Sequence, residues 1–383
     1  HSSAASAGDL FIDATTNLAV GGALIITATT GNITQGSELE VGTTSTFTTS
    51  ASNGTITLND ADNTFTDAVA LNTDGSSGNA TIKNDRALLL AASTVDGTLT
   101  ATATAGNITQ TGALDIEGTT TLVTLGQGAD IDLAANGTSN AFTQQLLITT
   151  NETGSDIDAD VSIDGGTTNL IIGTSTIDGD LTLLSGGTIT DTDGSTVTVK
   201  GILTATTDQL NKIITLNDLA VDGAFTLDPD GTGAVTIVNA AGLKLAASTM
   251  GGTFSGTATT GDISDSGNLA ITGAATFITT ANNRSIILDQ PNAFGSHVTM
   301  QAGNGSAAFD DITFVDSADV RLHSSAASAG DLYINATTDL AVGGNLSITA
   351  TTGHITQGGE LDIEGTTTLV TLEDHGTITL NDA

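Results

Sequence analysis

Apolar and polar residues alternate along this chain in short runs of about five residues. Clear examples are "ALIIT" at 23–27, "GTITL" at 54–58 and "ELDIE" at 360–364. An alternation with a period of two is typical of a β-strand that buries one face. Each run ends at Gly-Gly, Asp-Gly, Asn-Gly or Thr-Gly, pairs that favour turns because Gly, Asn and Asp tolerate a positive φ angle. The pattern therefore predicts many short strands joined by tight turns.

One short motif returns at regular intervals. It consists of an apolar residue, a variable residue, Gly, a second variable residue and another apolar residue, as in "VDGTL". Its copies begin at Val20, Val95, Ile177, Val199, Val221, Met250 and Val342. The three copies that begin at Ile177, Val199 and Val221 start about 22 residues apart. In each of the other four copies, the first residue of the motif is followed about 21 residues later by another apolar residue. Three short strands and three turns fill such an interval, which predicts one coil of a parallel β-solenoid.

Other repeat folds fit this period less well. Helical solenoids need periods above about 30 residues and strong helix formers, and propeller blades need about 40 residues. A β-sandwich does not generate a recurrence of this kind. We therefore predict an all-β fold, a single-stranded parallel β-helix of about 21–22 residues and three short strands per coil, continuous over residues 1–383. It should have roughly 17 coils and, at about 4.8 Å per coil, a length on the order of 80 Å. Val, Ile, Leu and Ala should form the core, with Phe225, Phe254 and Phe277 filling wider coils.

A much longer duplication is superimposed on this period. Residues 1–61 align with residues 323–383 without a gap, 43 of the 61 positions are identical, and "HSSAASAGDL" opens both copies. The interval predicts a super-repeat that spans 1–322, with 323–383 as the start of the next copy. Both ends of the chain have the ordinary repeat pattern, so we expect a segment of a longer protein. Its uncapped ends should meet neighbouring repeats of the same chain or stack on other copies end to end.

Composition narrows the possible partners. The chain carries 7 Lys and Arg against 43 Asp and Glu, a formal net charge of -36. Nucleic acid is an unsuitable partner because phosphate recognition needs basic residues. No stretch approaches the run of about 18 apolar residues that a membrane span needs, so we expect no membrane insertion. The hydrophobic fraction of 38% and its alternation indicate a folded chain despite the charge.

The repeats resemble those of a known family. "VGGNLSITATTGHITQGGELDIEGTTTL" and "GTITLNDADNTF" resemble the repeats of giant filamentous haemagglutinin-like adhesins of bacteria. The resemblance covers nearly the whole chain and is clearest at 18–61, 88–126, 243–280 and 339–383. It implies a right-handed parallel β-helix, export, and display at the bacterial cell surface as a stalk that holds a binding tip away from the cell. It further implies an extracellular shaft whose outer partner is a host or partner-cell surface.

The sequence offers few candidate catalytic residues. The chain has no cysteine, so it offers neither a thiol nucleophile nor Cys-ligated zinc. The histidines are His1, His297, His323, His354 and His375. His354 stands where other copies have Asn or Asp, which favours a turn residue over a catalytic one. Arg284 near Asp289, and Arg321 near Asp316 and Asp319, are the only neighbourhoods that suggest a polysaccharide-degrading β-helix enzyme. We predict no catalytic residue and no enzyme.

Calcium is the most plausible bound ion. Three acidic strings, "DIDAD", "DTDGS" and "DPDG", place carboxylates at alternate positions, so that they share one face of a strand or gather at a turn. The candidate ligands are Asp156, Asp158, Asp160, Asp191, Asp193, Asp228 and Asp230. None of the strings is a complete calcium loop, and the competing interpretation is Asp as a turn former. We expect no other cofactor.

Two further interpretations concern the exposed faces. Threonine runs such as "TATT" suggest a flat ice-binding face, but the runs come irregularly, and threonine also suits any exposed strand. Asn-x-Thr triplets at Asn53, Asn79, Asn107 and Asn136 are expected by chance in this composition. The sequence thus predicts a stiff, acidic shaft used in adhesion or cell–cell contact. The alternative is a solenoid face that binds glycan or a cell surface.

Overall fold

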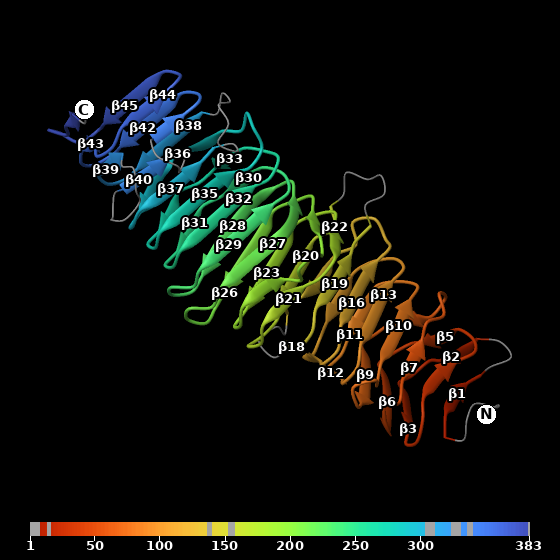
Figure 1. Cartoon of the computed structure of the whole chain (residues 1–383). Coiled ribbons are helices and arrows are strands. Elements are labelled where there is room, and N and C mark those ends of the chain that lie inside the picture. The colour runs from red at the N-terminus through yellow and green to blue at the C-terminus, as the bar shows by residue number, and fades with distance from the viewer. Residues whose placement is uncertain are drawn as a thin grey trace. The chain divides into compact units, whose positions relative to one another are not determined.

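The chain is a parallel β-solenoid of about 15 turns, which confirms the predicted fold class (Figure 1). The computed structural model describes residues 8–13, 17–135, 140–151, 158–302, 311–322, 331–334 and 340–381. Within these ranges every regular element is a β-strand, and no helix is long and apolar enough to cross a membrane. Two compact units can be distinguished in the chain, residues 1–201 and 202–383.

A representative turn shows how the sequence pattern forms this fold. Strands β13 (Leu99–Ala103), β14 (Ile108–Gln110) and β15 (Leu114–Ile116) follow one another, and alternate side chains of each strand are buried. The next turn begins with β16 (Thr120–Thr124), which pairs in parallel with β13 so that Leu99 lies opposite Thr120. These two residues are one predicted period apart in the sequence. Three short strands per turn and the predicted period are therefore confirmed.

The first unit has two principal sheets and a small third one. Sheet I contains β1 (Leu10–Ile12), β4 (Ile33–Gln35), β7 (Ile56–Leu58), β10 (Ala80–Asn84), β13, β16, β19 (Leu146–Thr149), β21 (Leu170–Ile172), β22 (Ser175–Ile177), β24 (Ile189–Asp191) and β25 (Val197–Val199). Sheet II contains β3 (Leu24–Ala28), β6 (Ser45–Ser52), β9 (Val69–Asp74), β11 (Leu88–Leu90), β12 (Ser93–Val95), β14, β15, β17 (Ile131–Leu133), β18 (Ala141–Phe142), β20 (Val161–Asp164) and β23 (Leu181–Ser185). The third sheet contains β2 (Leu18–Val20), β5 (Leu39–Val41) and β8 (Thr64–Phe65).

The second unit is built in the same way. Sheet III contains β27 (Ile214–Val221), β29 (Val235–Asn239), β32 (Phe254–Ala258), β35 (Ala275–Thr279), β37 (Val298–Gln301), β39 (Val320–Leu322), β40 (Asp331–Ile334), β43 (Ile355–Gln357) and β46 (Ile378–Thr379). Sheet IV contains β26 (Leu203–Thr207), β28 (Ala224–Pro229), β30 (Leu243–Leu245), β31 (Ser248–Met250), β33 (Ile263–Asp265), β34 (Leu269–Ile271), β36 (Ile286–Phe294), β38 (Ile312–Asp316), β42 (Leu346–Ala350) and β45 (Thr367–Thr371). Strands β41 (Leu340–Val342) and β44 (Leu361–Ile363) form a separate pair.

The number of turns is about 15 rather than the expected roughly 17 because some turns are longer than the predicted period. In the first unit Thr120 lies opposite Leu146, and Ile131 lies opposite Val161. In the second unit Ile312 lies opposite Leu346, which is the longest of these three intervals. Extra residues lie between the strands of these turns, while the stacked strands stay in register. Loops lengthen at little cost to a solenoid because the core depends on the strands.

The motif around "VDGTL" marks a close approach of two turns. The N–H of Gly118 donates to the carbonyl oxygen of Gly97, in the preceding turn, at 3.0 Å. A Cβ atom at Gly118 would clash with that carbonyl oxygen. Gly252 and Gly273 form the same pair in the second unit, at 3.1 Å. The glycines recur at this interval because any side chain would push the stacked turns apart.

The longer strands move from one sheet to the other at defined points. In the first unit the long strands β3, β6 and β9 lie in sheet II, whereas the following long strands β10, β13, β16 and β19 lie in sheet I. At the change, the single strand β9 pairs with both short strands β11 and β12, and the short strand β7 pairs with the long strand β10. We call such a change an exchange point. The parallel ladder continues through it because two short strands follow one long strand in sheet II, while one long strand follows a short one in sheet I.

The described strands contain four exchange points. In the first unit the long strands move between β9 and β10 (first exchange point) and between β19 and β20 (second). In the second unit they move between β28 and β29 (third) and between β37 and β38 (fourth). Strands β27 and β36 are also long, but each consists of two short segments separated by a register shift. The motif spacing conceals this larger unit, because it describes single turns.

The two copies of the duplicated segment have different strand partners. Strand β1 pairs with β4, with Leu10 opposite Ile33. Strand β40 carries the equivalent residues, but it pairs with β37 and β39. Strand β43, the equivalent of β4, pairs with β39 instead. Near identity of sequence therefore does not fix the neighbour of this strand.

The core of each unit is a column of buried aliphatic side chains, with phenylalanines at intervals. Phe225, Phe254 and Phe277 are all buried, as predicted. In the second unit the Phe254 and Phe277 ring centroids lie 5.2 Å apart, and the Phe294 and Phe314 rings stack at the same distance. Stacked rings of this kind add to the stabilisation by burial.

Replacing Phe277 tests this core. Phe277→Ala is expected to lower the free energy of unfolding by about 3–5 kcal/mol, because it leaves a cavity between two other rings. Thr276→Ala, on the outward face of the same strand, is the matched control and should change it by less than about 0.5 kcal/mol. Urea denaturation followed by circular dichroism measures both. Similar effects of the two substitutions would contradict the assigned faces of β35.

Candidate functional site

The first group of calcium candidates takes part in bonds between turns. Asp158 and Asp160 are exposed on either side of buried Ala159, and Asp156 lies outside the described residues. Asp160 Oδ1 accepts a hydrogen bond from the backbone N–H of Asp180 at 2.8 Å. The N–H of Asp160 donates to Oδ1 of Asp130 at 3.0 Å. Asp130 and Asp160 thus each satisfy a backbone donor of a later turn.

The second group lies at a tight turn. Asp191 is the last residue of β24 and is half-buried, whereas Asp193 is exposed. Asp193 and Gly194 are the central residues of a β-turn closed by the N–H of Ser195 and the carbonyl oxygen of Thr192, at 3.0 Å. Gly194 has a φ angle of 74°. This geometry is the one that favours Asp as a turn former.

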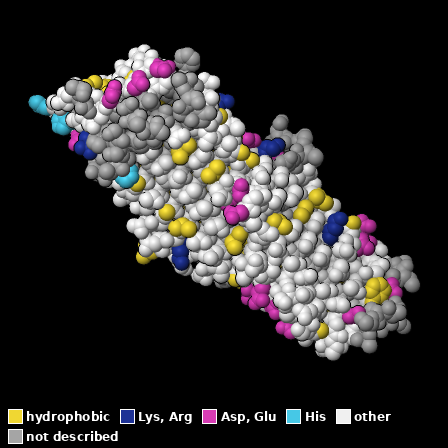
Figure 2. Space-filling view, in the orientation of Figure 1, with side chains coloured by type: hydrophobic (Ala, Val, Ile, Leu, Met, Phe, Trp, Pro, Cys, Tyr) yellow, Lys and Arg dark blue, Asp and Glu magenta, His cyan; other side chains and the backbone are white. Residues whose placement is uncertain are grey.

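The third group borders a shallow groove of the second unit. Asp228 and Asp230 are exposed and, with Asp208, line a recess of about 530 Å³ beside β28. Across the part of the chain that the structure describes, no three or more His, Cys, Asp or Glu residues gather closely enough to hold a metal ion. On the face shown in Figure 2, acidic side chains form small groups and apolar side chains stand mostly singly. Calcium binding stays a prediction.

The basic–acidic neighbourhoods of the sequence do not share one surface. Asp316 is buried at the end of β38 and accepts hydrogen bonds from the backbone N–H groups of Phe294 and Ser317. Arg321 and Asp319, in contrast, are exposed. The carboxyl group of Asp316 is therefore engaged with the backbone in the interior. Asp289, which the sequence places near Arg284, is exposed on β36.

Side-chain acceptors recur directly before the short strands β4, β33 and β43. Asn32 Oδ1 accepts the N–H of Thr55 at 2.8 Å, and Asp262 Oδ1 accepts the N–H of Ser285 at 2.9 Å. At the equivalent position His354 Nδ1 accepts the N–H of Thr377 at 3.0 Å. A backbone donor left unpaired between strands needs such an acceptor. This requirement explains why His, Asn and Asp exchange at this position.

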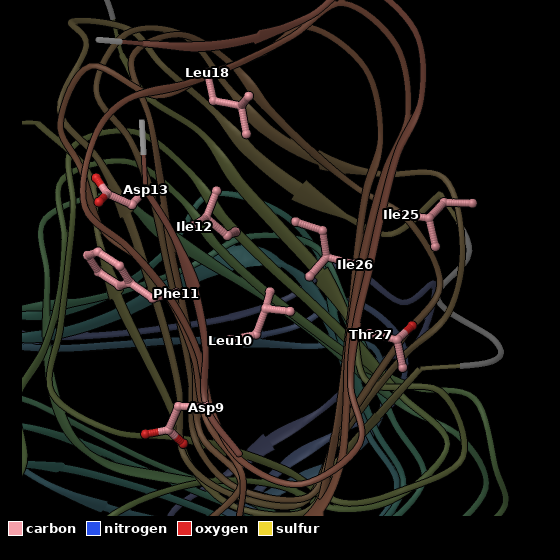
Figure 3. A pocket seen from close by; sticks show the side chains of 9 residues that line it. All are labelled: Asp9, Leu10, Phe11, Ile12, Asp13, Leu18, Ile25, Ile26 and Thr27. Atoms are coloured by element: carbon pink, nitrogen blue, oxygen red, sulfur yellow. The ribbon is translucent and has the colours of Figure 1, made fainter. Parts of the chain in front are cut away.

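The first described turn exposes residues that are buried elsewhere. Figure 3 shows Leu10, Ile12 and Ile26 around an open recess of about 550 Å³, while Ile25 points away from it. Ile26 is half-buried, but its equivalent in the second copy, Ile348, is fully buried. The recess is therefore the end of the apolar core where no preceding turn covers it among the described residues.

The last described turn shows the same contrast. Ile378 and Leu380 are 43% and 48% exposed. Their equivalents in the first copy, Ile56 and Leu58, are fully buried because the turn that contains β10 stacks on β7. Among the described residues, both end faces thus present apolar side chains and strand edges that no other described strand pairs with.

Buried amide side chains close the first exchange point. Asn63 is fully buried, and its Oδ1 accepts the backbone N–H of Leu39 at 2.9 Å. Asn63 and Gln35 form a reciprocal pair, in which each side-chain amide donates to the other at 2.7 and 2.9 Å. Asn140 and Gln110 repeat this pair ahead of the second exchange point, with both bonds at 3.1 Å. Such pairs are neutral and leave few polar atoms unsatisfied.

Asn84 completes the same exchange point. Its Oδ1 accepts the N–H of Phe65 at 2.8 Å, and its Nδ2 donates to the carbonyl oxygen of Phe65 at 3.0 Å. Phe65 lies on β8, which forms an edge of the small third sheet. Nδ2 also donates to the carbonyl oxygen of Ala87 at 2.7 Å. The side chain thus takes the place of a paired strand at an edge that the exchange leaves open.

Asn239 has the same role at the third exchange point. It accepts the N–H of Val221 and donates to its carbonyl oxygen, both at 2.9 Å. We call Asn84 and Asn239 the exchange-point amides. Sequence reasoning missed them because Asn in a Gly- and Thr-rich chain usually indicates a turn. For the related buried residues Asn63, Asn140 and Asn292, the available signal was the triplet Asn-Thr/Ala-Phe, whose phenylalanines are all buried.

Removing an exchange-point amide should lower the free energy of unfolding more than removing a side-chain acceptor from the surface of a turn. Asn84→Ala leaves the N–H and C=O of Phe65 unpaired in the interior and is expected to lower the free energy of unfolding by about 2–4 kcal/mol. Asn79→Ala, the control, removes one bond to the N–H of Thr98 from a half-exposed position and should cost about 1 kcal/mol. Urea titrations of the two variants compare these costs. A smaller loss for Asn84→Ala would refute the assigned role.

The sequence itself divides at the exchange points. Five segments match one family, described as repeats of unknown function (DUF5649), at residues 6–72, 77–149, 158–228, 232–301 and 310–383. The four gaps between the matches coincide with the four exchange points. Comparisons with curated proteins and with solved structures found no match. Since the five matches cover most of its length, the chain belongs to this family of repeats, the DUF5649 repeats, and contains five of them.

Proposed function

We propose that the chain is a structural segment, the shaft, of a long extracellular protein at a bacterial cell surface. In this role it holds an adhesive part of the protein away from the cell and contributes length and stiffness. Its partners along the axis are neighbouring repeats of the same chain or further copies stacked end to end, and its outer partner is a host or partner-cell surface.

The observation that carries the proposal is the continuity of the strand ladder across repeat boundaries. At the first exchange point β7 pairs with β10, and β9 pairs with β11 and β12, so each repeat provides the stacking surface of the next. A fold in which each unit contacts only its neighbours gains length with every added repeat. The end faces described above, with exposed Ile378 and Leu380, offer the same kind of surface.

The surface chemistry supports the same role. A net charge of -36 keeps long chains soluble and resists side-by-side association. Outward positions of the strands are occupied largely by threonine, as at Thr81, Thr100 and Thr121, which lie side by side in successive turns. The resemblance of the repeats to filamentous haemagglutinin-like adhesins supports the extracellular location and the adhesive context.

A lengthened chain tests the shaft. Because 323–383 repeats 1–61, continuing the chain after Ala383 with a copy of 62–322 should add stacked turns in register. This extension is expected to increase the maximum dimension in small-angle X-ray scattering by about 50 Å, at about 4.8 Å per turn. The amides of Ile378 and Leu380 should also become protected from hydrogen exchange. A control extension of the same composition in scrambled order should do neither, and an unchanged dimension for the ordered extension would contradict the proposal.

Surface labelling tests the location. In the organism that encodes the chain, an antibody against residues 1–383 should label intact cells, and protease added outside should remove the signal. The physical reason is that a shaft extends beyond the cell envelope. A cytoplasmic protein of the same organism serves as the control for cell integrity. Labelling that appears only after lysis would exclude an extracellular shaft.

A further inference from the structure

The fourth exchange point has a carboxyl group where the first and third have an amide, whereas β20 at the second ends at buried Asp164. Asp316 ends β38, the first long strand after the change, as Asn84 ends β10 and Asn239 ends β29. Asp316 is 2% exposed, and its Oδ1 accepts the N–H of Phe294 at 3.1 Å, the bond that Asn84 makes to Phe65. An ionised carboxylate has only acceptors, so it cannot reproduce the second bond, from the side-chain amide to the carbonyl oxygen.

A second substitution of the same kind lies in the preceding turn. Asp265, at the end of β33, faces Asn292 where Gln35 faces Asn63 and Gln110 faces Asn140. Asn292 Nδ2 donates to Asp265 Oδ2 at 2.7 Å. The amide pairs are reciprocal, and an ionised Asp265 cannot return a hydrogen bond. Asp265 also accepts the N–H of Asp289 at 2.9 Å, which partly satisfies its charge.

We infer that the fourth exchange point is a proton-dependent joint, closed when Asp316 carries a proton and loosened when it is ionised. Protonation moves one proton from solvent to the free carboxyl oxygen of Asp316. The resulting O–H donates to the carbonyl oxygen of Phe294 and restores the bond that the exchange-point amides make. Asp265 contributes in the same direction, because a proton on it completes the reciprocal pair with Asn292.

The surroundings of Asp316 favour the protonated form. Burial raises the pKa of Asp316 to about 6, against the lowering effect of the hydrogen bonds from Phe294 and Ser317. Burial also raises the pKa of Asp265, assisted by the charge of Asp289. Strand β36, on one side of β38, carries Asp289, which is exposed, and the described strand β42, on the other side, carries no titratable group. Asp319 and Arg321 follow β38 on the surface.

The sign of the pH effect follows from these directions. Because the pKa of Asp316 is higher in the folded chain than its ordinary value of 3.8, the folded state binds the proton more tightly than the opened state. The joint is therefore most stable below about pH 4 and loses this contribution as the pH rises to about 6. The expected change in the opening equilibrium constant is about 100-fold. The joints closed by Asn84 and Asn239 have no such dependence.

Amide hydrogen exchange of the full chain tests the joint. After correction for intrinsic exchange, protection of the Phe294 amide should fall by about 10-fold between about pH 5 and about pH 7.5, the upper part of the 100-fold range that begins below about pH 4. The Phe65 amide, closed by Asn84, is the internal reference and should show no corresponding change. Asp316→Asn should make protection at Phe294 independent of pH, whereas Asp222→Asn, at an exposed site of the same unit, should leave the dependence intact.

The reverse substitution keeps the test decisive if Asp316→Asn fails to fold. Asn84→Asp should transfer the pH dependence to the Phe65 amide at the first exchange point. Equal protection of Phe294 at both pH values in the unmodified chain would overturn the inference. So would a dependence that survives in Asp316→Asn, or a Phe65 amide that stays independent of pH in Asn84→Asp.

Discussion

The structure depends on one constraint, that each strand must find its backbone partners in the turns directly before and after it. A parallel ladder allows no local substitute for those partners, unlike a hairpin or a helix. The one-turn offset between Leu99 and Thr120, the stacked pair Gly97 and Gly118, and the side-chain acceptors before the short strands all serve this constraint. Each removes an obstacle or supplies a bond where the ladder would otherwise be interrupted.

The exchange points show how the same constraint is met where the pattern changes. When a long strand is followed by two short ones, part of an edge is left without a strand. Asn84 and Asn239 fill that position with a side-chain amide that offers both a donor and an acceptor, as a backbone does. The family repeat ends at these points. A repeat is therefore a group of turns with its long strands in one sheet, joined to the next repeat by buried polar side chains.

The buried polar side chains at the exchange points suit the proposed role as a shaft. A shaft must transmit its stacking through every boundary, and a boundary closed only by apolar contact would leave backbone groups unsatisfied in the interior. Buried amides provide closure that is indifferent to pH. A buried carboxyl, as at Asp316, gives up part of that closure in exchange for sensitivity to protons. The first, third and fourth exchange points are therefore joints of two kinds made from the same geometry.

The sequence by itself determined the strands, the turn period and the identity of the core. Alternation and the recurring glycine motif are local properties, so they can be read without the fold, and Phe225, Phe254 and Phe277 were assigned to the core on that basis. The candidate aspartates were also found in the sequence, but their partners were not, since Asp160 bonds to Asp180 in a later turn. The number of turns was overestimated because insertions do not alter the motif.

Only the tertiary structure decided the exchange points, the partners of β1 and β40, and the roles of Asn63, Asn84 and Asp316. An asparagine in a turn and an asparagine at a buried strand edge have the same local sequence pattern. Which of the two places an asparagine occupies depends on which backbone groups the neighbouring turns leave unpaired, as Phe65 does for Asn84. That information is absent from any local stretch, because hydrogen-bond satisfaction is a property of the assembled stack.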